Sequence, residues 1–332
     1  MGLDVAHESY SHTNITKSIK SFLINSEILP LVILLLLCIF FTLLQPAFLT
    51  YYNLLTILTQ MATLLILTVG MTMVILMGRI DLSTGGVVSF CSVSVAMLFP
   101  IAGLWAFVLG ILIGIAFGFI NGLLHQYLRI PSFISTFGVG GIALGLAYTL
   151  CNGQPIAVPQ EYTAYRLLII GDSIRGLGNI HLIALITVII GWIMLKFTPL
   201  GRYIYAIGYQ EKVAVMSGVS IVKTVIIVFM FYGLCAGLVG GLLTCRLAIG
   251  GPAVGDPLTL QAIATVLVGG TAINGGSGGI IRSLIGCAII TVLLNGMNIA
   301  AVNPYARQVI LGAVIVAVVA FTLDRAKISV VK

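Results

Sequence analysis

Charge is the property that this sequence has least of. Only 8% of its 332 residues are Asp, Glu, Lys or Arg, whereas a typical soluble domain carries about 25%. Hydrophobic residues make up 60%, the mean hydropathy is +1.18, and no charged residue occurs from Ile28 to Gly78. That uncharged stretch is longer than the roughly 20 residues that one membrane span needs. The composition excludes an ordinary soluble domain and indicates an integral membrane protein.

Metal-binding and disulfide patterns are also missing. The sequence has no C-x-x-C spacing and no H-E-x-x-H motif, and its four histidines are scattered. Cysteine packs well as a small apolar side chain. We interpret all six cysteines in that way: Cys38, Cys91, Cys151, Cys235, Cys245 and Cys287. The sequence therefore predicts neither a metal site nor a cofactor.

Enzymatic signatures are absent or incomplete. No G-x-x-x-x-G-K-[ST] phosphate-binding loop is present, so energy from a nucleotide would have to come from another chain. The residues around Ser277 match the G-x-S-G form in which rhomboid-type proteases hold their nucleophile. That serine needs a base within hydrogen-bond reach, and no histidine follows His181. We interpret the match as a glycine-rich turn and predict that the chain is not an enzyme.

An ion-coupled carrier usually keeps charged side chains at membrane depth, where they mark the ion path. Here every charged residue falls at the end of a predicted helix or in a loop. Asp81 is the nearest candidate, and it has two interpretations. In the first, the side chain of Asp81 or Ser83 caps the following helix, where the helix dipole favours a carboxylate. In the second, Asp81 takes a direct part in transport.

Ten apolar segments have the length of a membrane span. Nothing in them alternates with period two as a barrel strand does, so we expect helices whose backbone amides are satisfied internally. The sequence predicts an all-α polytopic membrane protein with about ten transmembrane helices, near residues 28–45, 54–77, 84–100, 104–127, 132–151, 180–196, 223–245, 258–273, 284–301 and 306–323.

The positions of Lys and Arg predict the orientation. With the N-terminus in the cytosol, twelve of these 16 residues fall on the inside and four on the outside, in accordance with the positive-inside rule. We therefore expect cytosolic tails at 1–27 and 324–332 around a transmembrane domain at 28–323. The first apolar run is expected to be a retained anchor and not a signal peptide. The net charge of +7 is a topology signal, since no basic patch typical of nucleic-acid binding is present.

Several motifs resemble the permease subunits of ribose-type monosaccharide ABC importers. They appear in family order over nearly the whole chain, from about residue 50 to 320. They are GRIDLSTGG from Gly78, PSFISTFG from Pro131, TPLGRYIYAIGYQEKVAVMSGVSI from Thr198, IATVLVGGTAINGGSGG from Ile263, LLNGMN from Leu293 and RQVILGAVIVAVV from Arg307.

The resemblance implies a permease in the bacterial inner membrane, paired with a second permease chain in what we expect to be a homodimer. A periplasmic sugar-binding protein would deliver the substrate, and a separate ATP-binding subunit would dock on the cytosolic connector at 197–222. Carried over by motif, the coupling residues are Gly201, Arg202, Ala206, Gly208, Glu211, Ala214, Ser217 and Gly218. For Arg202 an alternative remains, in which it anchors a helix end at the lipid headgroups.

Some positions depart from the family pattern. Tyr209 and Gln210 stand where the family has Gly-Asn, and Val213 replaces the first alanine of Ala-Ala. In a loop expected to be periplasmic, the uncharged Thr259 and Gln261 replace two carboxylates. The resemblance therefore leaves open which sugar is carried.

A sugar pathway needs uncharged hydrogen-bonding groups. Thr56, Thr59, Gln60 and Thr63 share one helical face. Further pathway candidates are Asp81, Ser83, Ser89, Ser92, Asn295 and Asn298. Such residues also commonly bond to their own backbone or join helices, so both interpretations stay open.

Two glycine repeats predict close helix packing: Gly110, Gly114, Gly118 and Gly122, and Gly233, Gly237 and Gly241. The segment at 152–179 is expected to be a periplasmic loop that contacts the binding protein. The sequence thus predicts a monosaccharide ABC permease. A branched-chain amino acid permease and an ion-driven carrier are the alternatives.

Overall fold

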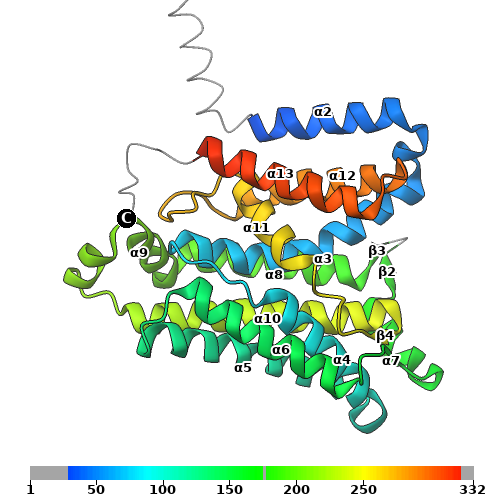
Figure 1. Cartoon of the computed structure of the whole chain (residues 1–332), viewed down its shortest axis with the longest axis horizontal. Helices are drawn as coiled ribbons and strands as arrows, with labels where there is room; N and C mark the ends of the chain where they lie inside the picture. Colours follow the sequence, from blue (N-terminus) through cyan, green and yellow to red (C-terminus); the bar gives the residue numbers. More distant parts are fainter. Residues whose placement is uncertain (1–28, 175–176, 323–332) are drawn as a thin grey trace, which may run out of the picture.

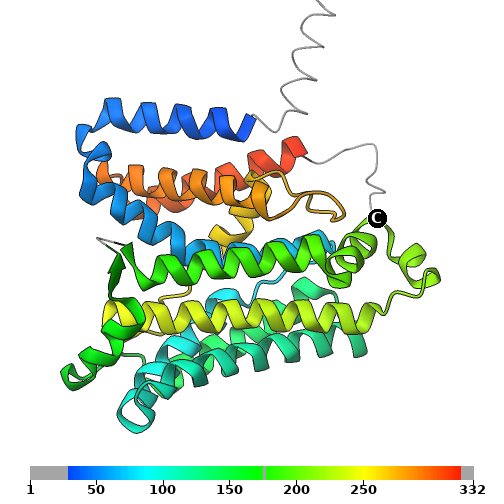
Figure 2. The same ribbon diagram turned by 180° about the vertical axis from the view of Figure 1, so that it is seen from behind.

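The computed structural model describes residues 29–174 and 177–322 of the chain. The predicted tails at 1–27 and 324–332 lie outside the described residues. The described residues form a helical bundle, with α9 protruding at one end and the short β-strands gathered at the other (Figures 1 and 2). We refer to these as the α9 end and the β4 end.

Each of the ten predicted segments contains a helix. Seven helices are long and apolar enough to cross a membrane: α3 (Tyr51–Leu76), α4 (Thr84–Ala102), α5 (Trp105–Tyr127), α6 (Ser132–Leu150), α8 (Asn179–Phe197), α10 (Ile221–Leu247) and α12 (Ile280–Ile299). Three others are apolar but shorter in their spanning part: α2 (Leu29–Leu44), α11 (Leu258–Val268) and α13 (Pro304–Thr322). The all-α membrane class is confirmed, and the count of ten spans stays a prediction.

The helix boundaries differ most around α11. This helix was expected to continue to residue 273 but ends at Val268, because Gly269 is followed by Gly270 at φ +87°, a conformation that favours glycine. A turn rich in positive-φ glycines then leads into α12, which begins at Ile280, four residues before the predicted start at 284.

Two segments expected as connectors contain regular structure. The segment at 152–179 holds β1 (Ile156–Ala157), a 3₁₀ turn at Gln160–Tyr162, α7 (Thr163–Ile170), β2 (Asp172–Ile174) and β3 (Leu177–Gly178). Strand β1 pairs antiparallel with β4 (Ile249–Gly250), so this segment is tied to the end of α10. The connector at 197–222 is mostly the helix α9 (Pro199–Met216).

The core lies where α10 packs against α3, α4 and α5. The glycine repeats make this packing close, as predicted. A Cβ atom on Gly118 would overlap the backbone at Phe229, and one on Gly237 would contact the carbonyl oxygen of Gly110. At the edge of the bundle, α2 packs against α12, where the Phe41 ring covers Gly296 and a short 3₁₀ turn at Pro46–Leu49 leads into α3.

Helix α4 begins inside the bundle. The segment between α3 and α4 crosses back into the protein before the helix starts (Figure 1), and Asp81, Ser83 and Thr84 are buried. The first-turn amide of Gly85 donates to the Thr259 hydroxyl of α11 at 2.8 Å. The local cap expected from Asp81 or Ser83 is therefore wrong, because neither side chain caps α4 and a distant residue takes that role.

Candidate functional site

A polar cleft of ≈ 680 Å³ lies between α3, α10, α11, α12 and α13. Amide side chains from four elements meet there, and each amide offers both donors and acceptors for hydrogen bonds. The polar residues that line it are Gln60, Thr63, Arg246, Asp256, Gln261, Thr291, Asn298, Arg307 and Gln308. Leucine and proline side chains make up most of the remaining lining, so the cleft combines apolar walls with hydrogen-bonding and charged groups and suits a small polar ligand.

The structure divides the predicted threonine stripe. Gln60 and Thr63 line the polar cleft, whereas Thr56 and Thr59 do not. The Thr56 hydroxyl donates to the Tyr52 carbonyl at 2.9 Å, and the Thr59 hydroxyl donates to the Leu55 carbonyl at 2.8 Å. Half of the stripe thus lines the cleft and half does not. The Thr59 hydroxyl also lies 3.3 Å from His181 Nε2 of α8, and Thr63 donates to the Thr59 carbonyl at 3.3 Å, so bonding within the helix does not separate the two halves.

The other pathway candidates are also divided. Asn298 lines the cleft, and its Oδ1 accepts from Arg307 at 2.8 Å. Ser89 accepts from the Gly255 amide at 3.0 Å, and the hydroxyls of Ser92 and Thr244 lie 2.8 Å apart. Ser89, Ser92 and the buried Asn295 do not line the polar cleft. Ser92 joins α4 to α10, and Ser89 joins α4 to the turn before α11, in agreement with the alternative interpretation that such residues hold the bundle together.

Residues that sequence reasoning missed come from helix ends. Arg246, Asp256, Arg307 and Gln308 line the cleft from α10, the segment before α11, and α13. Partial burial raises the pKa of the Asp256 carboxyl. A search for stripes along single helices does not find such residues, since they come from three different elements and Arg307 and Gln308 are adjacent in sequence. The signal available in the sequence was Gln261, already noted as a family departure.

Asp81 and Ser83 belong to a separate buried cluster. Asp81 Oδ1 accepts from the backbone amide of Ser83 at 2.7 Å and from its hydroxyl at 2.6 Å. Because the Ser83 proton is used in this way, its oxygen accepts from Asn121 Nδ2 at 2.8 Å. The cluster does not line the polar cleft, and its hydrogen bonds attach the start of α4 to α5. A direct part of Asp81 in transport stays a prediction.

Helix α9 is bent at its middle. Gln210 has non-helical angles, φ −160° and ψ 102°, which separates Pro199–Tyr209 from an outer segment at Glu211–Met216. The outer segment buries Ala214 but exposes large apolar side chains: Val213 at 51%, Val215 at 55% and Met216 at 87%, with Tyr209 at 85% beside it. We call these four residues the apolar face of α9. Exposed apolar side chains grouped in this way are typical of a docking surface.

The predicted coupling residues differ in where they point. Arg202, Glu211, Ser217 and Gly218 are exposed, Ala206 is half-buried, and Gly201 and Ala214 are buried. The close approaches made by the helical glycines are internal to the chain. A Cβ atom on Gly201 would overlap the Leu195 backbone, and one on Gly208 would overlap the Leu76 carbonyl. These glycines let α9 pack against the bundle.

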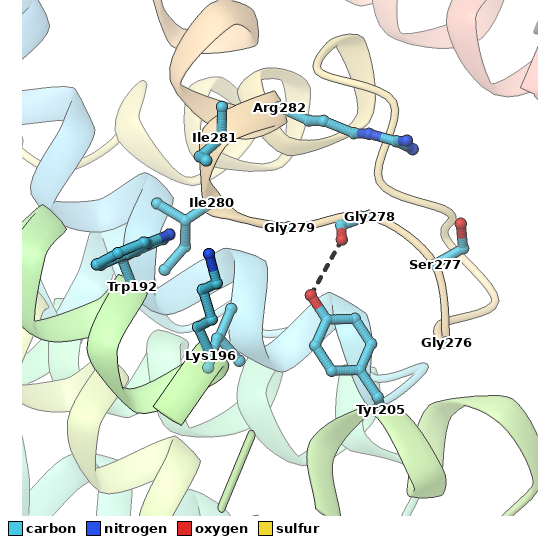
Figure 3. Close-up of a pocket in the computed structure, with 11 residues that line it drawn as sticks. Trp192, Lys196, Tyr205, Gly276, Ser277, Gly278, Gly279, Ile280, Ile281 and Arg282 are labelled. Atoms are coloured by element: carbon cyan, nitrogen blue, oxygen red, sulfur yellow. Dashed lines mark hydrogen bonds between the residues drawn. The ribbon is translucent and has the colours of Figure 1, made fainter. Parts of the chain in front are cut away.

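A second cleft, of ≈ 710 Å³, lies where α9 meets α8 and the glycine-rich turn (Figure 3). The Tyr205 hydroxyl donates to the Gly278 carbonyl at 3.0 Å, and burial raises the pKa of this phenol. The Gly276 amide donates to the Leu76 carbonyl at 2.9 Å. Lys196 lies 5.0 Å from the Trp192 ring centroid at the same cleft. The turn thus connects α3, α9 and α12. Among the described residues, no group of metal-ligating side chains is found.

The family model described as the permease component of branched-chain amino acid transport systems matches residues 53–319. The chain belongs to this permease family. The permease is 35% identical over 300 residues to the ribose import permease protein RbsC of Bacillus subtilis. The aligned region covers 90% of this chain and 92% of that protein. It is 34% identical over 289 residues to RbsC of Escherichia coli K12, covering 86% and 90% respectively.

A third relative is the D-allose transport system permease protein AlsC of Escherichia coli K12. The permease is 32% identical to it over 298 residues, which is 89% of this chain and 90% of that protein. No solved structure matches the chain. The three relatives are permease proteins, and the transport named for each concerns a monosaccharide.

Proposed function

We propose that this permease carries a monosaccharide of the ribose class across the bacterial inner membrane, driven by ATP hydrolysis on a separate subunit. The observation that carries the proposal is the similarity, over most of the chain, to permeases named for ribose and allose import. The amide-rich polar cleft supports it, because a sugar is bound through hydrogen bonds to its hydroxyl groups.

The proposal assigns partners to the two ends of the bundle. An ATP-binding subunit docks on the apolar face of α9, and a periplasmic sugar-binding protein meets the β4 end, where the 152–179 segment lies. A second copy of the permease completes the pathway. In this arrangement the α9 end is cytosolic, both termini are cytosolic, and all ten helices contribute to the transmembrane domain at 28–323.

The alternatives make different demands. A branched-chain amino acid carries two opposite charges and needs a fixed partner for each. Arg307 at the polar cleft already donates to Asn298 and to the Val302 carbonyl, but Arg246 and Asp256 also line the cleft and supply one charge of each sign. The cleft therefore does not separate the two substrate classes, and the preference for a sugar rests on the transport named for the relatives. An ion-driven carrier is not favoured by any of these relatives.

Reconstitution with the ATP-binding subunit and the sugar-binding protein in proteoliposomes tests the function. We expect ATP hydrolysis and uptake to be stimulated by one of a set of pentoses and hexoses, and not by leucine or valine. Arg202→Ala is expected to lower sugar-stimulated hydrolysis if Arg202 contacts the ATP-binding subunit. Stimulation by leucine alone would establish the amino acid alternative, and uptake that needs an ion gradient without ATP would overturn both.

A further inference from the structure

An ion pair connects α9 to the interior of the bundle. Glu211 Oε2 lies 3.2 Å from an Nη of Arg79, although 132 residues separate the two in sequence. The Arg79 side chain is 7% exposed and that of Glu211 is 54% exposed, so the pair joins a buried charge to a surface charge.

Glu211 is the negatively charged group among the hydrogen-bond partners of the Arg79 guanidinium. Arg79 Nε donates to His125 Nε2 at 2.8 Å, and its other Nη donates to the Met77 carbonyl at 2.9 Å. His125 Nδ1 lies 2.7 Å from the Ile130 carbonyl and therefore carries the ring proton, which makes the imidazole neutral. Both of these acceptors are uncharged. Burial lowers the pKa of the Arg79 guanidinium, and the Glu211 carboxylate opposes that effect.

Glu211 lies at the surface side of this pair. It is the first residue after the bend at Gln210, so it belongs to the outer segment of α9 that carries most of the apolar face. A partner that binds this face and displaces the outer segment would move the Glu211 carboxylate relative to Arg79. Leaving a buried guanidinium unpaired is costly, so the two charges are expected to move together.

Arg79 lies at the start of the segment that leads into α4. The next amide, Ile80 N, donates to Ser132 at 3.2 Å, and Leu82 N donates to Thr136 at 2.9 Å. These bonds attach the segment to α6. The Asp81, Ser83 and Asn121 cluster then attaches it to α5. A displacement at Arg79 is thereby passed to three helices of the bundle.

We propose that Arg79 is a positioning residue for coupling, which links the outer segment of α9 to the start of α4 through its ion pair with Glu211. The proposal rests on the proposed function, since it requires an ATP-binding subunit docked on α9. It assigns a role to Arg79 that neither the family motifs nor the comparisons supply. Its consequence is that loss of the pair separates ATP hydrolysis from sugar movement while leaving both partners bound.

The test measures sugar taken up per ATP hydrolysed in the reconstituted complex. Glu211→Gln keeps the shape and removes the charge, and Lys223→Gln removes an exposed charge just outside the connector as a matched control. We expect uptake per ATP to fall at least about fivefold in Glu211→Gln, the lower end of typical coupling between two sites. The control is expected to retain the wild-type ratio and wild-type subunit assembly.

Arg79→Met and the double variant Arg79→Met with Glu211→Gln complete a double-mutant cycle. We expect the double variant to be no worse than Arg79→Met alone, and Arg79→Lys to recover part of the ratio. A wild-type ratio in Glu211→Gln, or effects that multiply in the double variant, would overturn the proposal. If Arg79→Met fails to assemble, Glu211→Gln against its control still decides. Absence of sugar-stimulated hydrolysis in the wild type would instead contradict the proposed function.

Discussion

Gly114 of α5 and Gly233 of α10 face each other so closely that a Cβ atom on either would overlap the carbonyl oxygen of the other. The two helix backbones are therefore in direct contact at this point. Because lipid supplies no hydrophobic force between helices, association there depends on such close van der Waals packing. The contact holds α5 against α10.

Gly114→Ala is expected to destabilise the protein, because the added methyl group forces the two backbones apart. Overpacking of this kind typically costs about 1–3 kcal/mol. The matched control is Gly141→Ala in α6, where no atom lies within 4 Å of the added Cβ. Thermal unfolding in detergent, followed by intrinsic fluorescence, measures the difference. Equal melting temperatures for the two variants would contradict the packing role.

Thr259→Val is expected to destabilise the start of α4. The Thr259 hydroxyl accepts from the Gly85 amide at 2.8 Å, and valine has the same shape without an acceptor. Loss of a helix cap typically costs about 1 kcal/mol. Thr149→Val serves as the control, since Thr149 is exposed and bonds only within its own helix. A shift in melting temperature no larger than that of the control would exclude a capping role.

Gln60→Leu is expected to lower sugar uptake by roughly 2- to 10-fold, the effect of losing one neutral hydrogen bond to the substrate. Thr56→Val, one turn away on the same helix, is expected to have little effect because Thr56 bonds to the Tyr52 carbonyl and not into the cleft. Radiolabelled sugar uptake at subsaturating concentration measures both. A larger loss in Thr56→Val than in Gln60→Leu would place the pathway elsewhere.

Met216→Asp is expected to weaken binding of the ATP-binding subunit by at least about tenfold, since docking would bury an unpaired carboxylate. Met216 is 87% exposed on the apolar face of α9. Tyr127→Asp, at the end of α5 and 69% exposed in the native residue, is the control. Co-purification of the two subunits, quantified by titration, gives the affinities. Unchanged binding in Met216→Asp would show that the partner docks on another surface.

Tyr205→Phe is expected to lower stability at pH 8 by about 0.5–1.5 kcal/mol, the typical worth of its hydrogen bond to Gly278. Burial raises the pKa of the Tyr205 phenol above its ordinary value. The folded protein thus holds this proton to a higher pH than the unfolded chain does. The contribution is complete below the unfolded pKa of about 10 and is lost as the pH rises through the folded pKa.

The pH dependence of Tyr205→Phe is therefore specific. Its disadvantage relative to wild type is expected to shrink above about pH 10. Tyr203→Phe, on the same helix and 40% exposed in the native residue, is the comparison. Melting temperatures across alkaline pH measure both variants, and a disadvantage of Tyr205→Phe relative to wild type that stays constant with pH would argue against the buried hydrogen bond.

Much of the helical framework followed from the sequence because membrane helices must be long, apolar and internally bonded. The glycine spacing on α5 and α10 likewise predicted their contact, since a four-residue repeat places glycines on one face. The end of α11 was missed. Hydropathy continues through Gly269 and Gly270, whereas the backbone angle at Gly270 stops the helix.

The candidate site was harder to predict from the sequence than the helices were. A stripe along one helix predicted Gln60 and Thr63, which line the cleft, together with Thr56 and Thr59, which do not, because helical periodicity does not say which end of a face meets a cleft. The cap of α4 was assigned to its neighbours in sequence, whereas Thr259 provides it from another helix. Both errors have one cause: hydrogen-bond partners that are far apart in sequence leave no local pattern.

By itself the sequence determined the membrane class, the helical framework and, through its motifs, the permease family. Each of these depends on local composition, on the length of apolar segments or on the order of short motifs. The tertiary structure alone decided which polar side chains share a cleft and that the buried charge of Arg79 meets Glu211. Arg79 and Glu211 are 132 residues apart, and only the packing of α9 on the bundle brings them together. The pairing matters because a buried charge without a partner is costly.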